Sequence, residues 1–422
     1  MDVLVIGGGG REHALALALS RDPEVDAVHA APGNPGTAAV ATNHPVDALD
    51  GTAVADLATR LGVDLVVIGP EAPLVAGVAD AVRERGVACF GPSAEAARLE
   101  GSKAFAKEVM AAAGVPTAAA RTCRTPDEVA AALDAFGPPF VVKDDGLAAG
   151  KGVVVTDDRR AALDHAAACG QVLVEEYLDG PEVSLFAVTD GRTVLPFEPA
   201  QDAKRAHDGD RGPNTGGMGA YTPLPWAPPG LVEEVTEVVL VPTVRELARR
   251  GTPFQGLLYA GLALTGRGVR VVEFNARFGD PETQALLQRL ETPLGGLLLA
   301  AAQGRLHAVD PPRWHGGAAV TVVVAAEGYP DAPARGDEVR GVEEADALAG
   351  VDVVHAGTAH HEGRLVTSGG RVLAVTAVGT DLAHARERAY AGVALVDVRG
   401  SHHRSDIAEA AARSEAELQE AR

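Results

Sequence analysis

The 422-residue sequence has few cysteines, few aromatic residues and a shortage of positive charge. Its three cysteines, Cys89, Cys123 and Cys169, form no CxxC pair, so neither a disulfide framework nor a structural zinc site is indicated. The formal net charge of −21 argues against nonspecific nucleic-acid binding, which requires a basic face. The longest apolar runs, such as residues 316–326, fall short of the roughly 20 residues that span a membrane. We therefore expect a cytoplasmic protein without nucleic-acid or membrane partners.

The composition, 46% hydrophobic and 23% charged, is typical of globular proteins, and the length predicts two to four domains. In the first hundred residues, β-rich runs alternate with Ala/Leu-rich helical patterns, including one helix over 74–85. This alternation predicts a parallel sheet that binds ligands beyond the C-terminal ends of its strands. The strands are expected at 3–7, 27–33, 64–70 and 87–92.

The N-terminal stretch GGGGREHALA lacks two parts of a dinucleotide-binding fingerprint. Its pattern Gly7-x-Gly9-x-x-Glu12 has no third glycine, and the second strand ends in HAAP (29–32) without an acidic residue. A single phosphate at the helix N-terminus therefore fits better than a pyrophosphate. The residues predicted to bind that phosphate are Gly8, Gly9, Gly10 and Arg11, and Glu71, at a neighbouring strand end, is a further candidate for substrate binding. His13 is a further candidate for substrate contact.

Two later stretches are candidates for a nucleotide site. KDDGLAAGKGV places Lys143 and Lys151 around a turn of small residues, where backbone N–H groups can approach an anion. It is not a Walker A loop, and a hairpin with solvated lysines is the alternative. In EEYLDGPE, strand-end backbone groups could read an adenine edge and a carboxylate could bind ribose; solvated acidic residues are the alternative. The candidates in this second stretch are Glu175, Tyr177, Leu178 and Glu182.

The stretch VVEFNARFGD predicts a metal site. Glu273 and Asn275 are two residues apart on an expected strand, so they share a face, with Val272 and Phe274 on the opposite, apolar face. A carboxylate and an amide oxygen suit Mg²⁺, whose other ligands are waters and phosphates. Arg277 could neutralise a carboxylate or an acyl phosphate. An edge strand with a polar outer face is the alternative.

The stretch 201–221 is polar, glycine-rich and predicted to be a long loop, and such loops are usually functional or disordered. Lys204 offers charge in it, and Gly216 and Gly217 offer accessible backbone. We therefore include all three among the candidate substrate-binding residues.

In this order, GGGGREHALA, APGNPGTA, GPEAPLVAG, KDDGLAAGKGV, EEYLDGPEVS, PNTGGMGAY and EFNARFGDPETQ closely resemble the phosphoribosylamine–glycine ligase family, over nearly the whole chain. The resemblance implies an α/β and α+β multidomain fold of the ATP-grasp superfamily. Its expected parts are a Rossmann-like N-terminal domain (1–100), an ATP-grasp central domain (101–120 and 191–316), an ATP-grasp lid subdomain (121–190) and a small α+β C-terminal domain (317–422).

The family reaction joins glycine to 5-phosphoribosylamine through glycyl phosphate, with conversion of ATP to ADP and phosphate and with Mg²⁺ or Mn²⁺. The resemblance implies that Lys103 and Lys143 lie at the ATP phosphates. It also implies that Lys143 and Arg277 are catalytic, that Asp280 binds substrate, and that Glu273 and Asn275 hold the metal. We expect a monomer, with weak homo-oligomerisation as the alternative.

One departure from the family concerns the C-terminal tail. The family pattern Arg-x-Asp-Ile-Gly becomes Arg404-Ser405-Asp406-Ile407-Ala408 here, and no role is assigned to it. Three other functions remain as alternatives: a nicotinamide- or flavin-dependent oxidoreductase, a different ATP-grasp ligase such as a ribonucleotide carboxylase, and a catalytically silent nucleotide-binding regulator.

Overall fold

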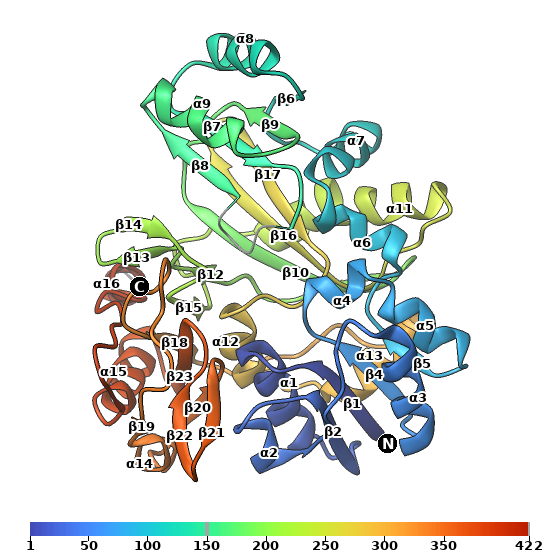
Figure 1. Cartoon of the computed structure of the whole chain (residues 1–422), viewed down its shortest axis with the longest axis vertical. Coiled ribbons are helices and arrows are strands. Elements are labelled where there is room, and N and C mark those ends of the chain that lie inside the picture. Colours follow the sequence, from blue (N-terminus) through green and yellow to red (C-terminus); the bar gives the residue numbers. More distant parts are fainter. Residues whose placement is uncertain (148–151, 421–422) are drawn as a thin grey trace.

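The computed structural model describes residues 1–147 and 152–420, and its polypeptide divides into a lower pair of sheet-containing regions, a central sheet and a projecting upper region (Figure 1). Within the described residues, no helix is both long enough and apolar enough to cross a membrane.

The N-terminal region contains the predicted parallel sheet, in the strand order β3-β2-β1-β4-β5. Its strands are β1 (Asp2–Gly7), β2 (Ala27–Pro32), β3 (Thr42–Asn43), β4 (Leu65–Ile68) and β5 (Ala88–Phe90). Its helices are α1 (Gly10–Ser20), α2 (Thr37–Val40), α3 (Gly51–Leu61), α4 (Glu71–Val75) and α5 (Val78–Glu84). The single helix expected over 74–85 is wrong, because Gly77 adopts a φ of +83° and separates α4 from α5.

Helices α6 (Ala94–Gly101) and α7 (Lys103–Ala113) lead to the upper region, residues 120–175, which we call the lid. Its antiparallel sheet has the order β6-β9-β7-β8. The lid elements are β6 (Ala120–Cys123), α8 (Pro126–Phe136), β7 (Phe140–Asp144), β8 (Val153–Thr156), α9 (Arg159–Ala167) and β9 (Val172–Glu175). These elements enclose a hydrophobic cluster of their own, so the lid packs as a separate unit.

Below the lid lies an antiparallel sheet of order β11-β10-β16-β17. Its strands are β10 (Glu182–Asp190), β11 (Val194–Pro196), β16 (Gln255–Thr265) and β17 (Gly268–Asn275), with the helices α10 (Leu231–Val235), α11 (Val241–Arg249), α12 (Glu282–Arg289) and α13 (Leu294–Ala302). A π-helical turn at Thr236–Leu240 joins α10 to α11. The prediction that Val272 shares the buried face of Phe274 is wrong, because a bulge in β17 places Val271 in the core instead.

The stretch 201–221 is not the structureless loop that its composition predicts. It contains β12 (Gln201–Asp202), β13 (Arg205–His207) and β14 (Arg211–Asn214), and β15 (Gly219–Thr222) begins within it. β13 and β14 pair as a hairpin, whereas β12 and β15 join a sheet formed mainly by the C-terminal part of the chain.

That C-terminal sheet has the order β12-β15-β18-β23-β20. Its remaining strands are β18 (Ala318–Ala325), β20 (Val351–His355) and β23 (Arg371–Gly379), and the shorter strands nearby are β19 (Val339–Arg340), β21 (Thr358–His361), β22 (Arg364–Thr367) and β24 (Asp397–Val398). The helices are α14 (Val342–Asp346), α15 (Leu382–Val393) and α16 (Glu409–Glu420).

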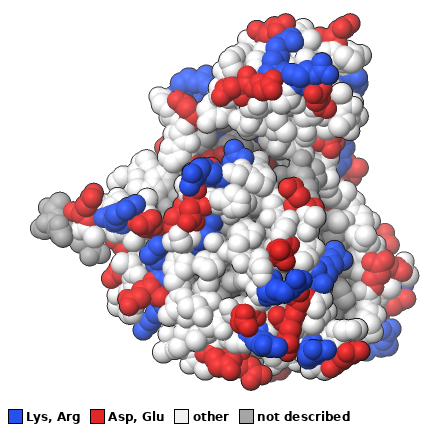
Figure 2. All heavy atoms as spheres, turned by 60° about the vertical axis from the view of Figure 1, so that its left-hand side comes forward, with Lys and Arg blue, Asp and Glu red and all other residues white. Residues whose placement is uncertain are grey.

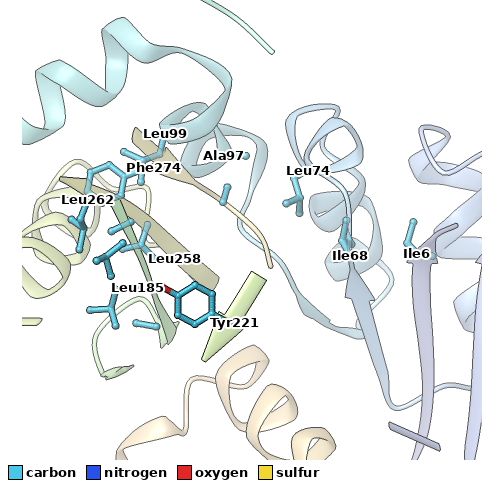
Figure 3. Packing of buried hydrophobic residues seen from close by; sticks show 14 of the residues in the cluster. Ile6, Ile68, Leu74, Ala97, Leu99, Leu185, Tyr221, Leu258, Leu262 and Phe274 are labelled. Carbon is cyan, nitrogen blue, oxygen red and sulfur yellow. The ribbon is translucent and has the colours of Figure 1, made fainter. Parts of the chain in front are cut away.

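One large hydrophobic cluster continues from the N-terminal region through the central sheet into the C-terminal sheet. Figure 3 shows part of it, from Ile6 and Ile68 of the parallel sheet to Leu258 and Phe274 of the central sheet. Because the lid cluster is separate from this shared core, the structure combines a single continuous body with an independently packed lid.

Candidate functional site

A cleft of about 1160 Å³ lies between the lid and the body. Figure 2 shows the surface hollowed beneath the upper region, with charged side chains of both signs around it. Fourteen of the predicted site residues line this cleft: Arg11, Glu71, Lys103, Lys143, Glu175, Tyr177, Leu178, Glu182, Lys204, Gly216, Glu273, Asn275, Arg277 and Asp280. The predicted residues Gly8, Gly9, Gly10 and Gly217 are not part of its lining, and Lys151 lies outside the described residues.

Two lysines hold the buried carboxylate of Glu175 at the junction of lid and body. Nζ of Lys143, on β7, lies 2.8 Å from Oε2 of Glu175, and Nζ of Lys107, on α7, lies 3.0 Å from Oε1. Lys143 also donates to the carbonyl of Val272 across the cleft, at 2.9 Å. Burial lowers the pKa of Lys107, and the Glu175 carboxylate opposes that effect. The Glu175 side chain is therefore committed to ion pairs within the protein.

The N-terminus of α7 faces the start of the glycine turn. Lys103 donates to the carbonyl of Gly146 at 2.9 Å, and the carboxylate of Asp145 accepts from the backbone N–H of Ala104 at 3.0 Å. Gln171 also donates to Asp145. Asp145 thus anchors the lid turn to α7, which places the ammonium of Lys103 beside that turn.

A second polar cluster surrounds Lys204. Its Nζ lies 3.1 Å from Glu182 and 4.0 Å from both Asp202 and Glu273. Burial raises the pKa of Asp202 to about 7, although Lys204 opposes the shift. The surrounding carboxylates outweigh burial for Lys204 and raise its pKa well above the usual value. Sequence reasoning missed Asp202, because an aspartate in a polar stretch is usually a solvated turn residue.

Glu273 and Asn275 meet the chemical requirements of a Mg²⁺ or Mn²⁺ site. Burial opposes ionisation of Glu273, but Lys204, Lys143, Lys103 and Arg277 outweigh it and lower the pKa of this carboxyl. The amide oxygen of Asn275 accepts from Arg277 at 3.0 Å and keeps a second lone pair. No group of three or more His, Cys, Asp or Glu side chains suited to a metal occurs among the described residues. Phosphates and water would therefore have to complete the coordination.

Arg277 lies in a chain of alternating charges. Its guanidinium lies 2.9 Å from Oε1 of Glu100 and 3.3 Å from Oε2 of Glu71, which in turn lies 3.9 Å from Arg11. Burial raises the pKa of Glu100, whereas the two arginines outweigh burial for Glu71 and lower its pKa. Glu100 also accepts from the backbone N–H of Ala276 at 2.7 Å. Sequence reasoning missed Glu100, since a lone glutamate in a helical pattern gives no signal of such pairing.

The N-terminal loop is shaped by Glu12, in the place where a dinucleotide loop needs its third glycine. The Glu12 carboxylate accepts from the backbone N–H of Gly9 at 2.7 Å and from Arg11 Nε at 2.6 Å. A side chain at Gly8 would meet the carbonyl of Gly33 at 2.6 Å, so only glycine fits there. Gly9 N–H is thus already used, whereas Gly10 begins α1, whose first-turn N–H groups have no intrahelical acceptors.

His13 is not part of the cleft lining. It is buried, its Nδ1 accepts from the backbone N–H of His355 at 2.8 Å, and the two rings pack edge to face. Burial lowers the pKa of His13 to about 3 and that of His355 to about 4. These neutral histidines connect α1 to β20 of the C-terminal region.

Arg371, on β23, brings the C-terminal region to the cleft. Its guanidinium lies 3.1 Å from the carboxylate of Asp280 and donates to the carbonyls of Gly216 and Asp280 at 2.6 and 2.7 Å. Burial opposes ionisation of Asp280, but Arg371 and Arg11 lower its pKa below the usual value. Two predicted substrate-binding residues, Asp280 and Gly216, are thus joined by an arginine that sequence reasoning missed.

The parallel N-terminal sheet, the central antiparallel sheet and the lid with its lysine-lined cleft define an ATP-grasp protein. Family models for the N, ATP-grasp (A) and C domains of phosphoribosylglycinamide synthetase match residues 1–100, 101–283 and 319–410 of this chain, respectively. The chain belongs to this family, and the predicted α/β and α+β multidomain fold is confirmed.

Relatives cover the chain almost completely. The phosphoribosylamine–glycine ligase of Streptomyces coelicolor is 67% identical over 414 residues, which cover 98% of this chain and 100% of the relative. That of Mycobacterium tuberculosis is 57% identical over 417 residues, covering 96% and 97%. A crystal structure of phosphoribosylamine–glycine ligase from Thermotoga maritima superposes with a TM-score of 0.84 at 34% identity, covering 96% of this chain and 100% of that one. N5-carboxyaminoimidazole ribonucleotide synthetase from the same organism shares the fold, with a TM-score of 0.65 at 19% identity over 94% and 99%.

Proposed function

We propose that this chain is a phosphoribosylamine–glycine ligase, which joins glycine to 5-phosphoribosylamine with conversion of ATP to ADP and phosphate. Family membership over nearly the full length supports the assignment. The observation that carries the chemistry is one cleft in which Lys103, Lys143, Lys204 and Arg277 surround the oxygen ligands Glu273 and Asn275. That arrangement suits transfer of a highly charged phosphoryl group, which depends on positioning and charge neutralisation.

The reaction has two steps. A carboxylate oxygen of glycine first attacks the γ-phosphorus of ATP, which forms glycyl phosphate as the bond to ADP breaks. The amine of phosphoribosylamine then attacks the glycyl carbonyl carbon, phosphate leaves, and the amine proton passes to solvent. Because the acyl phosphate is reactive toward water, the site must exclude solvent, and the separately packed lid is suited to that closure.

Individual roles follow from position. We assign Lys103 and Lys143 to the ATP phosphates and Arg277 to the carboxylate that becomes the acyl phosphate. Tyr177 and Leu178, which follow β9, are assigned to the adenine edge. Glu182 is assigned to the ribose, although its ion pair with Lys204 would then have to be shared.

The metal is assigned to Glu273 and Asn275, where a bound divalent cation would neutralise charge on the ATP phosphates. The acceptor is assigned to the part of the cleft beyond Arg277, where Arg11, Glu71 and Asp280 lie close to the N-terminus of α1. There Gly10 and Arg11 N–H groups are suited to the 5-phosphate. A cytoplasmic monomer remains part of the proposal.

The test is an ADP-release assay with each substrate omitted in turn. ADP formation should require both glycine and phosphoribosylamine; ADP formation with bicarbonate and another ribonucleotide would instead support the rival ATP-grasp ligase. Glu273→Ala should abolish turnover and weaken binding of Mg²⁺-ATP, while Glu233→Ala, an exposed glutamate on α10, should leave both unchanged. Unchanged kinetics in Glu273→Ala would refute the metal assignment.

A further inference from the structure

The β13–β14 hairpin (Arg205–Asn214) forms part of the cleft wall but has little to stabilise it internally. Its pairing is limited to two residue pairs with an irregularity between them, and only Ala206 is buried in it. An isolated two-stranded hairpin is marginally stable in water at best. The hairpin residues that line the cleft are Arg205, Asp210, Pro213 and Asn214. Contacts from elsewhere must therefore hold this part of the wall in place.

Those contacts come from the tail segment Arg404-Ser405-Asp406, to which the sequence assigns no role. Arg404 donates to the carboxylate of Asp210 at 2.7 Å and to the carbonyl of Arg205 at 3.3 Å. The backbone N–H of Gly209 donates to Asp406 at 2.8 Å. Ser405 adds a backbone hydrogen bond to Asp208, so each residue of the tail segment contacts the hairpin.

The tail segment is itself rigidly anchored. Arg404 is only 5% exposed and forms two 2.7 Å hydrogen bonds with Asp406. Ile407 is buried in the large core against Gly219 of β15, and Tyr390 of α15 donates to the carbonyl of Arg404 at 2.7 Å. The hairpin is thus held against an arginine–carboxylate pair that the C-terminal region fixes in place.

We propose that Arg404 and Asp406 are positioning residues, which hold the β13–β14 hairpin against the cleft so that Arg205 faces the phosphorylated substrates. The substrate class rests on the proposed function, whereas the restraint of the hairpin does not. The hydrogen bond from buried Arg404 to the exposed carboxylate of Asp210 is charge-assisted, and it joins two residues nearly two hundred positions apart in the chain.

Limited proteolysis tests the restraint directly, since exposed Arg211 places a trypsin site within the hairpin. Asp210→Asn removes the charge on the hairpin side but leaves Arg404 paired with Asp406. Asn also tolerates the φ of +52° at this position. Cleavage after Arg211 should be roughly two- to fivefold faster, because the Asp210 carboxylate is 77% exposed and cleavage follows the population of the open hairpin. Arg413→Gln, which breaks an exposed pair with Glu409 on α16, is the matched control.

Steady-state kinetics test whether the restraint of the hairpin affects substrate binding. Asp210→Asn should raise the KM for phosphoribosylamine or ATP by roughly two- to fivefold and leave kcat nearly unchanged, whereas mere loss of folded protein would lower kcat alone. Arg404→Lys, which keeps the charge, should give an intermediate KM and an intermediate cleavage rate. Cleavage no faster than in Arg413→Gln would overturn the restraint, and faster cleavage with unchanged KM values would overturn the positioning role. If the parent protein showed no ligase activity, the proposed function would fail while the cleavage result still decided the restraint.

Discussion

Glu100 provides a sharp test of the site because its interactions are confined to the segment that carries Arg277. One carboxylate oxygen lies 2.9 Å from the Arg277 guanidinium, and the other accepts from the backbone N–H of Ala276 at 2.7 Å. Glu100→Gln keeps the shape of the side chain but turns an NH₂ group toward one of these two donors. The substitution therefore removes a charge-assisted hydrogen bond and leaves a donor facing a donor.

The expected loss follows from those contacts. A hydrogen bond to a charged group contributes about 1.5–3 kcal/mol, which corresponds to an approximately 10- to 150-fold lower turnover if Arg277 acts in the transition state. The KM for ATP should change little, because Arg277 is assigned to the acyl phosphate rather than to the nucleotide. The measurement is ADP release at saturating glycine and phosphoribosylamine.

Glu95→Gln is the matched control, since Glu95 lies on the same helix, α6, and forms only an exposed pair with Arg98 at 3.2 Å. Such surface pairs contribute about 0–1 kcal/mol to stability and nothing to the cleft. If Glu100→Gln retained turnover within about twofold of Glu95→Gln, the positioning of Arg277 by Glu100 would be refuted. A double-mutant cycle with Arg277→Lys should give a coupling free energy of about 1 kcal/mol or more.

Two other perturbations follow from buried titratable groups. Because the pKa of His13 is lowered to about 3, the unfolded chain binds a proton below about pH 6.5 that the folded chain does not, so stability falls with falling pH. Between about pH 7 and pH 5, the protonation of His13 in the unfolded chain should lower the free energy of unfolding by about 2 kcal/mol. Urea unfolding of His13→Gln should lack this decrease. His307→Gln, at an exposed site, is the control and should retain it. Lys107→Met should lower the free energy of unfolding by about 1–3 kcal/mol, because it leaves one oxygen of the buried Glu175 without its cation. An unchanged urea midpoint in Lys107→Met would show that this ion pair contributes nothing to stability.

The parallel sheet could be predicted from the sequence because its strands are apolar, bounded by glycine and separated by amphipathic helices. Strand β1, for example, lies within one residue of its expected position at 3–7. The predictions that failed concerned strands whose pairing partners lie far away in the sequence. Strands β12 and β15 are only two and four residues long, and β15 is stabilised by pairing with β18, about a hundred positions away. The pattern of residues within these short strands does not predict pairing with so distant a strand.

The same distinction applies to the cleft. Glu273 and Asn275 could be identified because residues two apart on a strand point to the same face, and the structure places both in the cleft. Glu100 and Arg371 were not, because their ion-pair partners meet them only in the folded chain. Glu100 lies on a helix far from Arg277 in sequence, and Arg371 approaches Asp280 from the C-terminal sheet. Residues that share a face of one strand leave a local signal, whereas ion pairs between distant segments do not.

The C-terminal sheet has a consequence for exchanging parts between relatives. A chimera joined at residue 317 would pair β18 of one protein with β15 of another, and would place a foreign Arg404 against a native Asp210. The unit that can be transplanted intact therefore includes residues 201–222 together with the C-terminal region, although β16, β17 and the helices α10–α13 separate the two along the chain. A C-terminal region taken from a relative thus carries part of the lining of the substrate cleft with it. The substrate affinity of such a chimera should therefore change with the source of its C-terminal region.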